Sequence, residues 1–331
     1  MNLTDARGRV VRYLRLSVTD RCNLRCRYCR SGTEHFIPHP DILRYEEMLR
    51  FVGIASKLGV NKVRITGGEP FVRKGCADLL VMLRERLPRI DLRVTTNGVL
   101  LEPYVPLLAR LGVSAVNLSL DSFDRAAFAS VTGRDVLPAI LSALDKMLSV
   151  GLPVKINVVA VRGVNDGQLD DFVHAAKTLP IDLRFIEFMP MGSGTLWNEK
   201  NFWPADEIRE EISRRVRLTP VTGGRDDAGP ARVYAVEGGR GRIGFITSMT
   251  NHFCASCNRL RLTSDGHVRT CLFDDREYRL RGMLRSKRVS DRQIGEALRR
   301  VCALKPVGAD ILKRRVGDKA VAERRMTSIG G

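Results

Sequence analysis

The sequence predicts an α/β fold in which a parallel barrel or doubly wound sheet is followed by a smaller antiparallel module. Six β-rich runs alternate with helical patterns through the first two-thirds of the chain, and hairpin signals with cysteines fill the last third. The 331 residues suffice for one large domain or two ordinary ones. An apolar fraction of 44% and a charged fraction of 28% are globular values.

The six predicted strands are short and rich in β-branched and aliphatic residues. They are Tyr13–Val18, Lys62–Thr66, Leu92–Thr96, Ala115–Leu120, Val154–Val161 and Leu183–Met189. Before the fifth, Val136–Val150 places apolar residues at helical spacing. Strands in series with helices between them are typical of parallel sheets.

Polar or glycine-bearing segments follow five of these six strands. They are Thr19–Asp20, Gly67–Pro70, Thr96–Gly98, Ser119–Asp121 and Met189–Pro190. Because the carboxyl ends of parallel strands lie at one edge, we expect these segments to line one site.

The pattern changes after a predicted helix over Ala205–Arg215. Two pairs of short strands are expected, each around a glycine-bearing turn: Ala231–Glu237 with Arg242–Thr247, and Arg259–Thr263 with His267–Leu272. A helix over Asp291–Ala303 and a basic tail follow. We expect this part of the chain to form the smaller module.

The chain is strongly basic. Lys and Arg number 55 against 37 Asp and Glu, and residues 281–331 hold half of the net charge of +18. This balance favours an anionic partner: nucleic acid, a membrane surface or a phosphorylated small molecule. Aromatic content is only 6% without an RNA-binding signature, so nucleic acid is not expected. No apolar run approaches the roughly 18 residues of a membrane span, and the charged start suggests no signal peptide; we expect a cytoplasmic protein.

The eight cysteines fall into two groups of three and two isolated residues. In a reducing compartment, such groups indicate metal ligands rather than disulfides. The isolated Cys76 and Cys302 are expected to be small buried hydrophobes. The groups therefore predict two metal centres, each lacking a fourth cysteine: Cys22, Cys26 and Cys29, then Cys254, Cys257 and Cys271.

The first group has the spacing CxxxCxxC and comes directly after the first predicted strand. Three thiolates hold three irons of a [4Fe–4S] cluster and leave the fourth iron open to another ligand. A zinc site needs a further ligand, and no histidine follows at zinc-finger spacing. The spacing therefore favours a cluster over zinc.

This motif, with Tyr28 before its last cysteine and the sequence GGEP at Gly67–Pro70, resembles the radical S-adenosylmethionine (SAM) superfamily. The resemblance implies that SAM chelates the open iron and is cleaved reductively to a 5′-deoxyadenosyl radical. Matching positions imply SAM contacts from Tyr28, Gly68, Ser119 and Met189. Met189 also fits a plain core position.

The second group has the spacing CxxCx13C. His252 is an alternative fourth ligand, which would complete a Cys3His zinc site. Its close spacing to Cys254 speaks against this site, so we favour a second cluster with an open iron.

The block from Cys254 to Cys271 closely resembles the GTP 3′,8-cyclases of molybdenum-cofactor biosynthesis. The resemblance also includes Arg15, Lys62–Pro70 and the terminal Gly330-Gly331. It implies a partial (βα)6 TIM-type barrel over residues 1–215 and a smaller antiparallel α+β module over 216–331. That module would carry the second [4Fe–4S] cluster, whose open iron binds the guanine of GTP in that family.

The resemblance implies a lyase for the first step of molybdenum-cofactor biosynthesis. The adenosyl radical would take hydrogen from C3′ of GTP, and a C3′–C8 bond would lead to 3′,8-cyclo-7,8-dihydro-GTP. The catalytic residues that it implies are Arg15, Arg259, Arg261, Gly330 and Gly331.

GTP is a polyanion, yet the chain has no GxxxxGK[ST] phosphate loop. Basic residues two apart on a strand project to one face, as Lys62 and Arg64 do on one strand and Arg259 and Arg261 on another. By position, the resemblance implies GTP contacts from eight residues: Arg15, Lys62, Arg64, Thr95, Lys155, Arg184, Arg259 and Arg261.

Two other functions stay open at this stage. One is a radical SAM enzyme that acts on a peptide or an RNA, and the other is a non-catalytic iron- or zinc-binding nucleic-acid protein. The resemblance also implies a homodimer, a low-potential electron donor and a downstream cyclic pyranopterin monophosphate synthase; a membrane partner is not expected.

Overall fold

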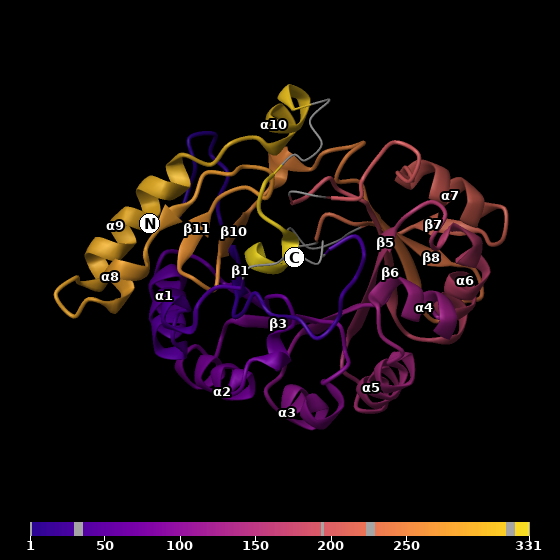
Figure 1. The fold of residues 1–331 in the computed structure, drawn as a ribbon, viewed down its shortest axis with the longest axis horizontal. Helices are drawn as coiled ribbons and strands as arrows, with labels where there is room; N and C mark the ends of the chain where they lie inside the picture. The colour runs from indigo at the N-terminus through magenta and orange to yellow at the C-terminus, as the bar shows by residue number, and fades with distance from the viewer. Residues whose placement is uncertain (1, 30–35, 193–194, 223–228, 316–321, 331) are drawn as a thin grey trace.

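The computed structural model describes residues 2–29, 36–192, 195–222, 229–315 and 322–330. A single open sheet organises them, with the strand order β12-β11-β10-β1-β2-β3-β4-β5-β6-β9-β8-β7. The sheet curves strongly, helices cover its convex side, and the C-terminus lies on the concave side (Figure 1).

The six strands expected in the first two-thirds are present, with ends within two residues of the predicted ones. They are β1 (Tyr13–Ser17), β2 (Lys62–Thr66), β3 (Asp91–Thr96), β4 (Ala115–Ser119), β5 (Val154–Ala160) and β6 (Asp182–Glu187). Each pairs in parallel with the next. Their carboxyl ends therefore lie at one edge, as the sequence predicted.

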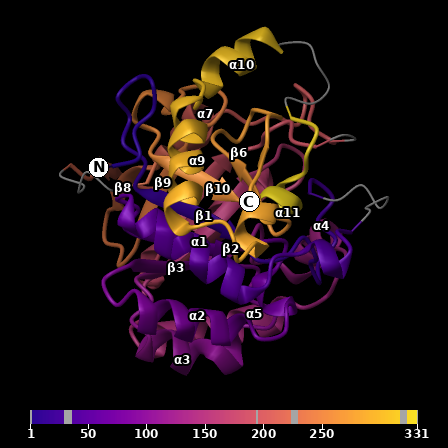
Figure 2. The ribbon, with the colours of Figure 1, turned by 90° about the vertical axis from the view of Figure 1, so that its left-hand side faces the viewer.

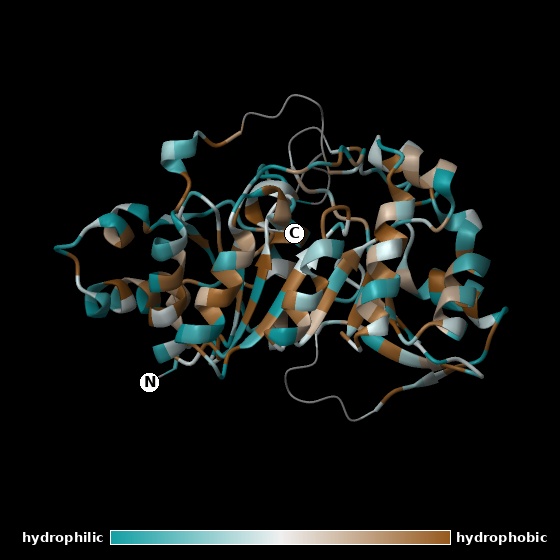
Figure 3. Cartoon of the chain, turned by 90° about the horizontal axis from the view of Figure 1, so that it is seen from below, coloured by the Kyte–Doolittle hydropathy of each residue, from teal (hydrophilic) through white to brown (hydrophobic). Residues whose placement is uncertain are grey.

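Helices connect these strands on the convex side. They are α1 (Tyr45–Lys57), α2 (Cys76–Arg86), α3 (Val105–Arg110), α4 (Arg125–Thr132), α5 (Leu137–Ser149) and α6 (Leu169–Thr178), and α7 (Ala205–Ser213) follows β6. The helix predicted over Val136–Val150 is confirmed as α5, which buries Ile140, Leu144 and Met147 at helical spacing. Apolar residues gather along the strands and on the helix sides that face them (Figure 3).

The last third adds strands to both edges of the same sheet. They are β7 (Leu218–Pro220), β8 (Arg232–Val236), β9 (Arg242–Ile246), β10 (Arg259–Leu262), β11 (His267–Arg269) and β12 (Tyr278–Arg279). The two predicted hairpins are confirmed: β8 pairs antiparallel with β9, and β10 with β11.

The expectation of a separate antiparallel module is corrected in one respect. β10 pairs in parallel with β1, and β9 pairs in parallel with β6. Pairing between strands this far apart in the chain leaves no local sequence pattern, because register depends on which faces are buried in the folded chain. The division at residues 215 and 216 stays a prediction, since strands on both sides of it share one sheet.

Four helices complete the described chain: α8 (Arg281–Arg285), α9 (Asp291–Ala303), α10 (Gly308–Arg314) and α11 (Met326–Ile329). The predicted helix Asp291–Ala303 is confirmed residue for residue as α9. It begins with a capping box between Ser290 and Gln293 and packs beside α1 (Figure 2). Within the described ranges no single helix is long and apolar enough to cross a membrane, although the bent pair α4–α5 passes by length and composition.

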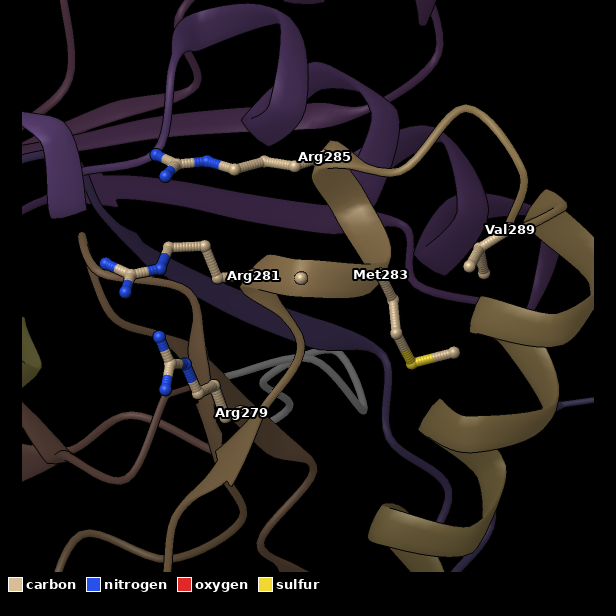
Figure 4. A pocket seen from close by; sticks show the side chains of 6 residues that line it. Arg279, Arg281, Met283, Arg285 and Val289 are labelled. Carbon is tan, nitrogen blue, oxygen red and sulfur yellow. The ribbon is translucent and has the colours of Figure 1, made fainter.

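Part of the basic C-terminal segment holds the fold together. Arg281, Arg285 and the exposed Arg279 line an open surface pocket of about 550 Å³ beside α8 (Figure 4). Arg281 pairs with Asp41 at 2.8 Å, and Arg285 pairs with the buried Glu47 at 3.1 Å. None of the pocket residues is a predicted site residue, and two of its arginines join α8 to the N-terminal segment.

Arg50 on α1 makes the reciprocal connection. Its guanidinium donates to the carbonyl oxygens of Leu284 (2.9 Å), Ser286 (3.2 Å) and Val289 (2.5 Å), and it pairs with Asp291 at 2.8 Å. We expect Arg50→Ala to lower the free energy of unfolding by about 2 kcal/mol, because charge-assisted hydrogen bonds to carbonyls are lost. Denaturant unfolding measures this, and Arg299→Ala on the exposed side of α9 is the control, with no comparable change.

Candidate active site

The loop after β1, which carries the first cysteines, is bonded to the GGEP loop after β2. The amide of Gly68 donates to the Thr19 carbonyl and that of Glu69 to the Arg21 carbonyl, both at 2.8 Å. A Cβ on Gly68 would lie 2.3 Å from the Arg21 carbonyl oxygen. Glycine at this position is therefore required for the cysteine loop itself, a reason that the sequence argument did not include.

Glu69 is a residue of the motif to which the sequence analysis assigned no role. Its buried carboxylate accepts hydrogen bonds from the amides of Phe71 (3.1 Å) and Asn97 (2.7 Å) and from the Thr96 hydroxyl (2.9 Å). Burial raises the pKa of Glu69 to about 7, although these hydrogen bonds oppose the shift. Glu69 thus joins the loops that follow β2 and β3.

The structure brings the first three cysteines together in the loop after β1. Burial, then the charges of Asp121, Cys29 and Cys22, raise the pKa of Cys26 well above its usual value, so the three sulfurs interact electrostatically. The Cys22 sulfur accepts from the Leu24 amide at 3.4 Å and the Asn97 side chain at 3.6 Å. Such N–H···S bonds suit cluster thiolates.

The predicted SAM contacts lie at the carboxyl ends of the strands. The Tyr28 hydroxyl donates to Asp121 at 2.5 Å, two residues beyond Ser119, and its ring meets Phe188, beside Met189, at 6.2 Å. Met189 packs against a small apolar cluster, so the plain core position is part of its environment. Asp121, whose pKa burial raises to about 6, joins Tyr28 to β4 and was not singled out.

The second three cysteines also converge. Gly308 lies between two of their sulfurs. A Cβ on Gly308 would lie 3.0 Å from the sulfur of Cys271 and 3.5 Å from the sulfur of Cys254. The Ala309 amide donates to the Cys254 sulfur at 3.3 Å. The start of α10 therefore covers this group, which the sequence did not reveal.

Neither group has the geometry of a site for one ion. No three His, Cys, Asp or Glu side chains in the described ranges are placed to hold a single metal. His252, the alternative zinc ligand, instead contacts the Ser248 carbonyl through Nδ1 at 2.9 Å. Cys76 and Cys302 are buried in the core, as expected.

The two groups lie at opposite ends of the β1–β10 pair. Because β10 runs parallel to β1, Cys257 precedes the start of the pair, whereas Cys22 follows its end. Between them, Arg15 lies in register with Arg261 on one side and Arg64 on the other. The predicted basic residues of three strands are thus brought side by side between the cysteine groups.

These arginines repel one another. Burial and the charges of Arg64 and Arg259 lower the pKa of Arg15 to about 10. Burial and the charges of Arg15 and Arg259 lower the pKa of Arg261 well below its usual value. Burial raises the pKa of Tyr13, but the neighbouring arginines outweigh it and lower the pKa to about 7. In the described chain, neither Arg64 nor Arg261 has a carboxylate partner. Such a cluster of positive charge favours the binding of an anion.

The remaining predicted GTP contacts have carboxylate or hydroxyl partners that the sequence analysis missed. Asp182 pairs with Lys155 at 3.0 Å and with Arg184 at 3.6 Å, and Asp91 lies 3.9 Å from Lys62. The Thr95 hydroxyl accepts from Arg64 at 3.4 Å. All members of the set are described, and the structure places them on six strands of the sheet: β10, β1, β2, β3, β5 and β6.

The C-terminal tail reaches the arginines. The Gly330 carbonyl accepts from Arg15 Nε at 3.2 Å and from Arg261 Nη1. The tail is further held by Arg324, which pairs with Glu277 at 2.8 Å. Gly330 has φ of 75°, and a Cβ there would lie 2.6 Å from the Thr66 methyl group. Gly331 lies outside the described residues.

Comparisons with known proteins agree with this arrangement. Residues 16–176 match the model of the Radical SAM superfamily, and residues 181–311 match Molybdenum Cofactor Synthesis C. A GTP 3′,8-cyclase from Thermodesulfovibrio yellowstonii is 41% identical over 99% of this chain and all of its own. The mitochondrial GTP 3′,8-cyclase of Arabidopsis thaliana is 39% identical over 99% of this chain and 83% of its own.

This chain belongs to the GTP 3′,8-cyclase family. Membership in the radical SAM superfamily brings SAM and a [4Fe–4S] cluster as cofactors. The fold agrees: SuiB of Streptococcus suis superposes with a TM-score of 0.63 over 91% of this chain and 68% of its own, at 15% identity. That identity relates the two by fold alone.

Proposed function

We propose that this protein is a GTP 3′,8-cyclase, which converts GTP to 3′,8-cyclo-7,8-dihydro-GTP in the first step of molybdenum-cofactor biosynthesis. One observation carries the proposal: Arg15, Arg64 and Arg261 lie side by side on three neighbouring parallel strands, between the two cysteine groups. Full-length similarity to GTP 3′,8-cyclases supports it.

The proposal includes an architecture. Strands β1 to β6 and their helices form a partial (βα)6 TIM-type barrel over residues 1–215, and residues 216–331 supply the module with the second cluster. The addition of β9 and β10 to the edges of the sheet encloses the concave side, which helps to shield a reactive intermediate from water.

Each cysteine group holds one [4Fe–4S] cluster through three thiolates. When bound, the first cluster and SAM supply the 5′-deoxyadenosyl radical that takes hydrogen from C3′ of GTP. Tyr28, Gly68, Ser119 and Met189, around the carboxyl ends of the strands, contact SAM. Cys254, Cys257 and Cys271, at the other end of the row of arginines, would hold the second cluster, whose open iron would bind the guanine.

The basic residues hold and orient the triphosphate. Arg64 and Arg261 offer guanidinium forks that match phosphate oxygens, and an arginine–phosphate bond nets roughly 1.5–3 kcal/mol. Lys155 and Arg184 share Asp182, which orders both side chains before substrate arrives. Three arginines orient the substrate for C3′–C8 bond formation: Arg15, Arg259 and Arg261. The Gly330 carbonyl positions Arg15 and Arg261.

The test uses anaerobically reconstituted protein, dithionite, SAM and GTP deuterated at C3′. We expect deuterium in 5′-deoxyadenosine by mass spectrometry and the cyclised nucleotide by chromatography. SAM cleavage without deuterium transfer would contradict GTP as substrate and favour a peptide or RNA. Absence of cleavage with iron present in both sites would favour a binding protein.

The other implied partners are part of the same proposal. Family membership supports a homodimer, a low-potential electron donor and a downstream cyclic pyranopterin monophosphate synthase. A cytoplasmic location stays an expectation from the sequence.

A further inference from the structure

A lysine cation is buried beside the second cysteine group. Lys305 lies between α9 and α10, and only 5% of its surface is exposed. Its ammonium donates to the carbonyl oxygens of Arg259, at 2.8 Å, and Thr270. Arg259 follows Cys257 by two residues and Thr270 immediately precedes Cys271, so both bonds direct the charge toward cluster ligands.

No carboxylate pairs with Lys305 anywhere in the described ranges. A buried ammonium without a counter-charge is costly, by several kcal/mol even after the surroundings relax. The nearby Cys302 stays a neutral thiol, because burial raises its pKa to about 12.

The neighbouring Arg9 differs from Lys305 in having a carboxylate partner. Its guanidinium also reaches this region, donating to the carbonyl oxygens of Cys254 and Pro306 at 2.9 Å. Arg9 is paired with the buried Asp5 at 2.5 Å. Of these two cations, Arg9 has a carboxylate partner, whereas Lys305 has none among the described residues.

We propose that Lys305 is the counter-cation of the second [4Fe–4S] cluster and raises its reduction potential. Three thiolates outweigh the positive charge of the iron–sulfide core, so the bound cluster is an anion. One-electron reduction adds a further negative charge, which a buried cation beside the cluster ligands stabilises in a low-dielectric interior. The reduced form is therefore favoured. This inference rests on the second cluster of the proposed function and does not depend on GTP.

The experiment isolates the second cluster in the full chain. Cys22, Cys26 and Cys29 are all replaced by alanine, and the protein is reconstituted anaerobically with iron and sulfide. The midpoint potential is then measured by an electron paramagnetic resonance redox titration. Lys305→Met keeps the length of the side chain and removes its charge, Lys305→Gln retains an N–H donor, and Lys313→Met on the exposed side of α10 is the matched control.

We expect Lys305→Met and Lys305→Gln to bind iron and to lower the equilibrium constant for reduction about tenfold, which is about 59 mV for a one-electron couple. Lys313→Met leaves the potential unchanged. A lower thermal midpoint with an unchanged potential in both Lys305 variants would show a merely structural lysine and overturn the inference. If the parent protein binds no iron at Cys254, Cys257 and Cys271, the proposed second cluster itself is refuted.

Discussion

Replacing Gly68 with alanine is expected to remove the first iron–sulfur cluster and leave the second in place. The new methyl group would lie 2.3 Å from the Arg21 carbonyl oxygen and 2.9 Å from that of Asp20. These are backbone atoms of the loop that leads into Cys22, so they yield only if the loop moves. Reconstituted iron should fall to the content of one cluster, and SAM cleavage should be lost.

The matched control is Gly53→Ala on α1, where a Cβ meets nothing within 4 Å. Alanine is also the better helix former, so this variant should keep both clusters and be at least as stable. Circular dichroism of Gly68→Ala distinguishes a local loss from unfolding. Full SAM cleavage with a complete iron content in Gly68→Ala would show that the close contact does not position the loop.

The second large effect is expected at the contact between Arg261 and the tail. Arg261→Ala removes donors to the carbonyls of Gly330 and Ile329, and it removes a cation from the proposed triphosphate site. Each lost charge-assisted hydrogen bond is worth roughly 1.5–3 kcal/mol, so cyclisation should fall about tenfold to a hundredfold or more. Both clusters should remain, because no cysteine is touched.

A double-mutant cycle shows through which partner Arg261 acts. The single variants are Arg261→Ala and a chain that lacks Gly330 and Gly331, and the cycle combines them. If Arg261 works through the tail, the combined loss in kcat/KM equals that of one change alone. Additive losses would show that Arg261 binds substrate independently of the tail. Arg299→Ala serves as the exposed control, with no change in turnover.

Local patterns predicted the strands and helices well. Helix α9 was predicted residue for residue and β2 likewise, because their apolar periodicity and turn residues act over a few neighbouring positions. The βα alternation also predicted that the loops after the strands, to which SAM contacts are assigned, lie at one edge of the sheet. The attachment of β9 and β10 to opposite edges could not be foreseen, because it depends on pairing between residues far apart in the chain.

The candidate site divides in the same way. Cysteine spacing and the GGEP sequence predicted the two clusters and SAM, because each of these motifs is a short stretch of the chain. Buried carboxylates and cations such as Glu69, Asp182 and Lys305 lack such spacing, and nothing in the sequence separates them from charged residues at the surface. Their partners lie on other segments of the chain, so only the folded structure shows which of these charges are buried and what they contact.

By itself, the sequence determined the chemistry of this protein: two cysteine groups, the GGEP sequence and an excess of positive charge. The tertiary structure decided where that charge lies and what balances it. It placed Arg15, Arg64 and Arg261 in one row between the cysteine groups and buried Lys305 with no carboxylate partner among the described residues. The physical reason is that the energy of a charge depends on its burial and its neighbours, which are set by packing across the fold rather than by order along the chain.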